Sequence, residues 1–149
     1  MSPISEFADR INEIIPIMMR EFVKRQGNEL IKGKITLPQF LILEFLHRES
    51  VSTMSQIAHF MDVSTAAITG FIDRLVRDRY VVRTYEPQDR RIILAKLTSR
   101  GNELVRKINQ QRRQMVISTF GKISETDRKE YLRILTQIKD KLTKENLSK

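Results

Sequence analysis

The sequence predicts a mainly α-helical fold with one small β-hairpin, and three observations lead to this expectation. Apolar residues recur at three- and four-residue intervals near both ends of the chain, which is the pattern of long amphipathic helices. Several shorter apolar runs follow a threonine or serine that can begin a helix. Strand-like composition is confined to residues 81–85 and 92–97, on either side of the turn-forming Glu86-Pro87-Gln88-Asp89.

Composition restricts the classes of partner. The 149 residues carry 27 Lys and Arg against 18 Asp and Glu, a formal charge of +9, so the chain attracts polyanions, with nucleic acid first and an anionic membrane surface second. The chain contains no cysteine, which excludes disulfides and thiolate zinc sites, and two histidines are too few for a histidine-rich cluster. We expect no metal and no cofactor. Without a signal-like start or a membrane-length apolar run, the sequence predicts a soluble cytoplasmic protein that does not bind membranes.

Residues 4–26 predict the first helix, and Pro16 is expected to bend it or divide it, because proline removes a backbone donor inside a helix. Thr36, with Gln39 three residues later, then forms a capping box that opens a helix to about His47. Its expected apolar face consists of Phe40, Leu41, Leu43, Phe45 and Leu46.

The next segment predicts two short helices joined by a tight turn. Thr53 and Gln56 form a second capping box, and Ser64 can cap the following helix. Asp62 occupies the turn, since aspartate tolerates a left-handed backbone better than most residues. The second helix is expected to bury Ala67, Ile68, Phe71, Ile72 and Leu75. This arrangement is a helix-turn-helix, and the hairpin that follows it would be its wing.

Two long helices complete the chain. Thr98 can cap one that runs to about Phe120, and Ser124 can cap the last. The apolar stripe of the last helix comprises Tyr131, Ile134, Leu135, Ile138 and Leu142.

The hairpin and the residues after it carry a specific motif, Asp89-x-Arg91 followed by Leu97-Thr98-x-x-Gly101. In this motif, in the segment Phe71–Leu75 and in the order of the elements, the sequence resembles the MarR family of bacterial transcriptional regulators over nearly its whole length. The resemblance implies a single chain, 1–149, with a winged helix-turn-helix lobe at 36–97. It also implies a homodimer whose interlocked helices are residues 4–26 with 102–145, and a small aromatic or phenolic effector.

The predicted recognition helix supplies the first candidate DNA contacts. Small side chains at its start allow close approach to the major groove, where threonine hydroxyls can bond base edges and methyl groups can contact thymine. These candidates are Ser64, Thr65, Ala66, Thr69 and Gly70, of which Ser64 is mainly a cap.

The wing supplies the second set. Arg90 and Arg91 lie at its tip, where an arginine can enter a narrow minor groove. For Arg91 the resemblance leaves open a structural pairing with Asp73, and Asp89 is expected to order the turn. The candidates for phosphate contact are Arg74, Arg77 and Arg83, although Arg77 can equally pair with Asp78.

Together with the resemblance to the MarR family, these observations predict a ligand-responsive, homodimeric repressor that binds a pseudo-palindromic duplex. The alternative is an architectural DNA-binding protein without an effector response. An enzyme is disfavoured because the carboxylates are scattered and those near the predicted DNA face lie beside arginines. The residues Met18, Met19, Phe22, Phe40 and Phe45 could line an effector cavity or form ordinary core, so no effector site is assigned.

Overall fold

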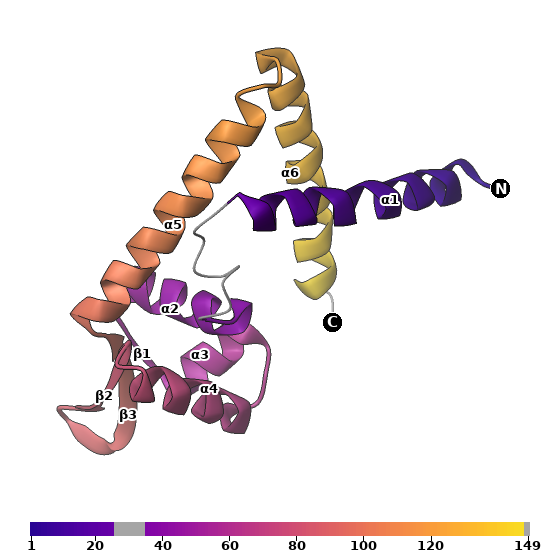
Figure 1. The fold of residues 1–149 in the computed structure, drawn as a ribbon. Coiled ribbons are helices and arrows are strands. Elements are labelled where there is room, and N and C mark those ends of the chain that lie inside the picture. The colour runs from indigo at the N-terminus through magenta and orange to yellow at the C-terminus, as the bar shows by residue number, and fades with distance from the viewer. Residues whose placement is uncertain (26–34, 148–149) are drawn as a thin grey trace. The chain divides into compact units, whose positions relative to one another are not determined.

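The computed structural model describes residues 1–25 and 35–147 (Figure 1). The contacts divide the chain into two compact units, residues 1–111 and 112–149, and each is described by itself. The elements follow in the order α1 (Pro3–Lys24), α2 (Leu37–Glu49), β1 (Val51–Thr53), α3 (Met54–Met61), α4 (Thr65–Arg77), β2 (Val81–Glu86), β3 (Asp89–Leu97), α5 (Ser99–Phe120) and α6 (Glu125–Leu147).

The mainly α-helical class with a hairpin wing is confirmed, but the sheet has three strands in the described chain rather than the two expected. The strand order is β1-β3-β2, and both pairings are antiparallel. The missed strand, β1, pairs Val51 with Lys96 and Thr53 with Leu94. Three residues are too few to show an alternating pattern, so this strand exists because β3 provides its partner.

The core of the first unit lies between α2, α3, α4, the sheet and the first turns of α5. Two details differ from the expected burial. Ile42 of α2 is fully buried, whereas Ala67 of α4 is exposed, since it lies about 100° around the helix from its buried neighbour Ile68. The largest fully buried side chains are Phe40, Ile42, Leu43, Leu46, Ile57, Ile68, Ile72, Leu75, Ile108, Val81 and Val105.

The predicted helix caps are present. Thr36 and Thr53 each form a complete capping box, with Gln39 and Gln56 respectively. Ser124 Oγ accepts a hydrogen bond from Asp127 N at 3.1 Å in the second unit. Asp62 adopts the left-handed conformation at φ 54° and ψ 47°, which ends α3 and turns the chain toward α4.

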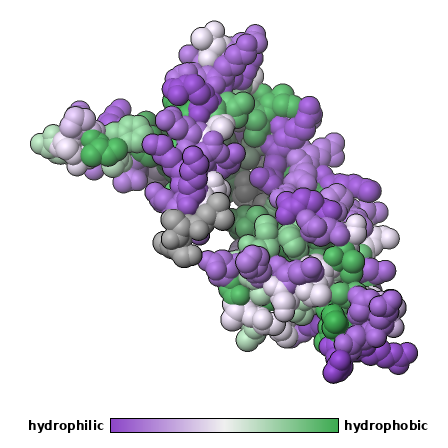
Figure 2. Space-filling model, turned by 180° about the vertical axis from the view of Figure 1, so that it is seen from behind, coloured by the Kyte–Doolittle hydropathy of each residue, from purple (hydrophilic) through white to green (hydrophobic). Residues whose placement is uncertain are grey.

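Helix α1 is continuous from Pro3 to Lys24, so Pro16 does not divide it into two helices. None of its residues is buried in the single chain. Hydrophobic side chains therefore lie uncovered on the surface, and Figure 2 shows such residues in green among the hydrophilic ones. No helix of the described chain has a stretch long and apolar enough to cross a bilayer.

The second unit is a helical hairpin formed by the end of α5 and by α6. Arg128 closes the turn between the helices by donating a hydrogen bond to Phe120 O at 3.1 Å, which satisfies a carbonyl at the end of α5. The rings of Phe120 and Tyr131 stack at 5.2 Å between centroids.

The start of α5 is joined closely to the end of the recognition-helix segment. Thr98 N donates to Tyr80 O at 3.0 Å, and Thr98 Oγ1 donates to Arg79 O at 2.6 Å. The same hydroxyl accepts from Gly101 N at 3.1 Å, which caps the helix as expected. Gly101 is buried against Tyr80 O, so the first turn of α5 packs directly on the backbone of Tyr80.

Candidate nucleic-acid interface

Helix α4 has one buried face and one open face. Ile68, Ile72 and Leu75 anchor it in the core, and this anchoring leaves the opposite side uncovered. Every small residue predicted to contact DNA lies on the exposed surface, namely Ser64 at the N-cap and Thr65, Ala66, Thr69 and Gly70 on the helix. Figure 1 shows α4 beside the β2–β3 hairpin, so the two predicted reading elements belong to one lobe.

The hydroxyl groups at the start of α4 are already partly used. Ser64 Oγ accepts a hydrogen bond from Ala67 N at 3.1 Å, which is the expected N-cap. Thr69 Oγ1 donates to Thr65 O at 3.0 Å. Since a hydroxyl has one proton and two lone pairs, Thr69 can still accept a hydrogen bond from a base amino group, as adenine or cytosine presents in the major groove.

Gly70 stands in open space on the exposed face of α4. A Cβ built there meets no atom within 4 Å, and no positive φ requires glycine. The absent side chain therefore leaves room for a close approach of the helix backbone to a partner, and it is not required for packing within the described chain.

We expect Gly70→Ala to raise the free energy of unfolding by about 0.5–1 kcal/mol, because alanine loses less backbone entropy in a helix. Denaturant unfolding measures the change. An unchanged or lower stability would contradict it. If Gly70 is needed for close approach to DNA, the same variant weakens binding to duplex DNA although it folds more stably.

The tip of the wing is ordered by Asp89 and Arg91. Arg91 Nε and Nη2 each donate to the Asp89 carboxylate at 3.0 Å, and Arg91 N donates to Asp89 Oδ1 at 3.1 Å. These hydrogen bonds hold the pKa of the Asp89 carboxyl below its ordinary value. The side-chain hydrogen bond from Arg91 has the larger effect on this pKa, and the backbone hydrogen bond adds to it. The stabilisation of the turn is thus present at neutral pH and is lost as the pH falls and the carboxylate protonates.

The pairing of Arg91 with Asp73 that the resemblance suggested is absent. Asp73 of α4 instead accepts a hydrogen bond from Arg83 of β2. The two reading elements are therefore joined at the base of the wing and not at its tip. The sequence pattern did not reveal this pair, because the contact depends on how α4 packs against β2.

Three of the arginines predicted to contact DNA have side chains that are exposed to solvent. Arg74, Arg77 and Arg90 are exposed, and none of them forms an ion pair with another described residue. Arg83 and Arg91, in contrast, have carboxylate partners. Among the described residues there is no cluster of His, Asp and Glu side chains suited to a metal ion.

Comparison with known proteins agrees with this geometry. The family model described as MarR family matches residues 35–93. The chain is 32% identical over 101 residues to an uncharacterized HTH-type transcriptional regulator, YhbI, of Bacillus subtilis, a match that covers 68% of this chain and 65% of YhbI. It is 31% identical over 109 residues to the multiple antibiotic resistance protein MarR of Escherichia coli, covering 69% of this chain and 76% of that protein. The chain belongs to the MarR family.

The fold of this MarR-family chain is also that of solved relatives. The crystal structure of Streptococcus pneumoniae FabT in complex with DNA has a TM-score of 0.76 at 21% identity, covering 92% of this chain and 98% of FabT. The similarity shows a shared winged-helix fold. The family consists of DNA-binding transcriptional regulators, not of enzymes.

Proposed function

We propose that this MarR-family chain is a sequence-specific transcriptional repressor that binds double-stranded DNA in the cytoplasm as a homodimer. The observation that carries the proposal is the open face of α4 beside a wing whose tip arginine, Arg90, has no ion-pair partner among the described residues. A helix with small exposed residues fits a major groove, and an arginine at a hairpin tip fits the adjacent minor groove.

Electrostatics supports DNA as the partner. The formal charge of +9 draws a polyanion to the chain, and Arg74, Arg77 and Arg90 hold exposed charge near or on the reading elements. Arg83 and Arg91 form ion pairs with Asp73 and Asp89, so in this proposal their main role is to hold the wing in place. Ordering the wing before DNA arrives reduces the entropy cost of binding.

The homodimer is supported by apolar surface that the single chain leaves uncovered. On α6, large apolar side chains at three- and four-residue spacing are all exposed: Tyr131, Ile134, Leu135, Ile138 and Leu142. On α1, exposed apolar residues include Ile4, Phe7, Ile11, Ile14 and Ile15. Such long stripes on soluble helices indicate a protein partner, and a second copy of the chain supplies complementary stripes.

A response to a small aromatic effector is the finer part of the proposal. The alternative is a DNA-binding architectural protein without an effector. The two differ in one observation, since only a ligand-responsive repressor loses operator affinity when a small molecule binds.

Selection of bound sequences from random duplexes tests the proposal. A dimer on a two-fold symmetric site selects two inverted half-sites whose centres are about one DNA turn apart, roughly 34–36 Å. Enrichment of no motif, or of a single unrepeated motif, would overturn sequence-specific binding by a symmetric dimer.

The affinity for the selected duplex is expected to fall steeply with salt. If about 6–10 phosphates are contacted, the dissociation constant rises by roughly 10³–10⁵ between 50 and 200 mM salt, because condensed counterions are released on binding. Fluorescence anisotropy at several salt concentrations measures the slope. A flat response would refute phosphate-dominated binding.

Arg90→Ala is expected to weaken binding by about 1–3 kcal/mol and to reduce the preference for A·T pairs at the outer edge of each half-site. The reason is that a narrow, A·T-rich minor groove has an enhanced negative potential, which attracts the positively charged guanidinium of Arg90. The matched control is Arg106→Ala, which removes an exposed arginine of α5. Equal losses for both variants on all duplexes would show that Arg90 contributes only net charge.

A further inference from the structure

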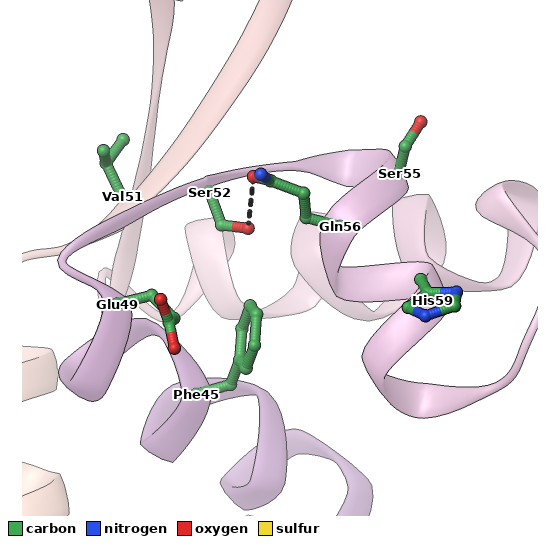
Figure 3. Close-up of a pocket in the computed structure, with 7 residues that line it drawn as sticks. All are labelled: Phe45, Glu49, Val51, Ser52, Ser55, Gln56 and His59. Carbon is green, nitrogen blue, oxygen red and sulfur yellow. Dashed lines mark hydrogen bonds between the residues drawn. The ribbon is translucent and has the colours of Figure 1, made fainter. Parts of the chain in front are cut away.

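A pocket in the winged-helix lobe lies apart from the proposed DNA contacts on α4 and the wing. It opens between the end of α2, the short strand β1 and helix α3, and its volume is about 460 Å³, within the range of small-molecule sites (Figure 3). The lining residues are Phe45, Glu49, Val51, Ser52, Ser55, Gln56 and His59.

The pocket combines an aromatic wall with hydrogen-bonding groups on two sides. Figure 3 shows the ring of Phe45 between Glu49 on one side and the Ser52–Gln56 pair above it. The ring is held by stacking on Phe60 at 4.5 Å between centroids. A rigid ring of this kind offers apolar contact to a flat ligand with little loss of entropy.

Glu49 supplies the only carboxylate among the described lining residues. Its ion pair with Arg48, at 3.5 Å, is solvent-exposed on both sides and therefore weak. The guanidinium of Arg48 also lies over the Phe45 and Phe60 rings, at 5.6 and 5.5 Å. A carboxylate beside an aromatic wall favours a ligand with N–H donors or a positive charge.

The opposite side of the pocket offers hydrogen-bond donors. Gln56 Oε1 accepts from Ser52 Oγ at 3.0 Å and from Thr53 N at 2.9 Å, which fixes the orientation of the side-chain amide. The amide nitrogen then has two N–H groups that no described residue accepts. A ligand acceptor, such as a ring nitrogen, matches them.

We propose that this pocket binds a small planar heteroaromatic amine, with Glu49 accepting its N–H edge and Gln56 donating to its acceptor. The regulatory meaning of the site rests on the proposed ligand response, but binding itself is independent of DNA. The site adjoins the reading elements, because β1 pairs with β3 of the wing and α3 packs against α4. A ligand that contacts α2, β1 and α3 can therefore shift the elements that position the wing and the recognition helix.

The test uses 2-aminobenzimidazole as the probe, whose exocyclic amine and ring N–H form a two-donor edge for a carboxylate. The full chain is titrated without DNA at pH 8, and binding is followed by two-dimensional amide NMR. Amide signals within residues 45–59 are expected to shift. Benzimidazole, which lacks the amine, and benzoate, whose negative charge is repelled by Glu49, are expected to bind at least about tenfold more weakly.

Glu49→Gln keeps the shape of the side chain and removes its charge, so it is expected to weaken probe binding at least about tenfold. Glu103→Gln, an exposed carboxylate on α5, is the matched control and is expected to bind like the original chain. The proposal would be overturned if Glu49→Gln bound the probe as tightly as the original chain, or if both variants lost the same affinity for it. It would also be overturned if the NMR shifts were confined to residues outside 45–59, or if benzoate bound more tightly than the probe.

Affinity for duplex DNA without the probe separates this inference from the proposed function. Glu49→Gln is expected to bind DNA as the original chain does, because Glu49 is not among the proposed DNA contacts. A chain that binds the probe but no DNA would leave the pocket standing and refute the repressor. A chain that binds DNA but not the probe would refute the pocket and leave the proposed repressor standing.

Discussion

Gly101→Ala is expected to lower the free energy of unfolding by about 3 kcal/mol, a large effect for the addition of one methyl group. A Cβ at this position would lie 2.2 Å from Tyr80 O and 3.1 Å from Tyr80 C. These are backbone atoms, which cannot turn aside as a flexible side chain can. The first turn of α5 must therefore move away from Tyr80, which disrupts the hydrogen bonds that Thr98 forms with Arg79 O and Tyr80 O.

Further contacts at this joint would be lost with the same movement. The Arg100 guanidinium lies over the Tyr80 ring at 4.8 Å, and His47 Nδ1 is 2.9 Å from Asn102 Oδ1. The joint connects α5 to the lobe that contains α4, so its distortion is also expected to weaken DNA binding.

Thermal unfolding by circular dichroism at fixed protein concentration measures the loss of stability, which should lower the melting temperature by roughly 6–12 °C. Gly70→Ala is the matched control, since it adds the same methyl group where no atom lies within 4 Å. If the two variants had the same melting temperature, the close approach of Gly101 to Tyr80 would not constrain α5.

Ile138→Glu is expected to dissociate the proposed dimer, raising its dissociation constant by at least about 100-fold. Ile138 is 49% exposed in the single chain, and substitution of such a surface residue usually changes stability by less than about 0.5 kcal/mol. In a dimer that covers the α6 stripe, the same substitution buries an unpaired carboxylate, which costs several times as much. The size of the effect thus distinguishes a free surface from an interface.

Sedimentation at micromolar concentration, together with thermal unfolding, provides the measurement. Gln137→Glu introduces the same charge at the adjacent exposed position outside the apolar stripe and is expected to remain dimeric. Leu142→Glu, one turn further along the stripe, should behave like Ile138→Glu. A well-folded monomer of the original chain would remove the basis of the prediction.

Local features of this protein were predictable from the sequence because each depends on residues a few positions apart. The capping boxes at Thr36 and Thr53 close within three residues, and the left-handed turn at Asp62 follows from the conformational preference of one side chain. The amphipathic stripe of α6 and the hairpin turn are likewise repeated or contiguous patterns. The predicted DNA contacts remain predictions, since they concern a partner and not the chain itself.

The tertiary structure decided the features in which distant segments meet. The strand β1 forms because β3 offers it hydrogen-bonding partners, and Asp73 pairs with Arg83 because α4 packs against β2. The pocket beside Glu49 exists because α2, β1 and α3 converge there. Periodicity and capping describe how a segment folds on itself, whereas these contacts depend on the packing of one element against another, which a local pattern does not contain.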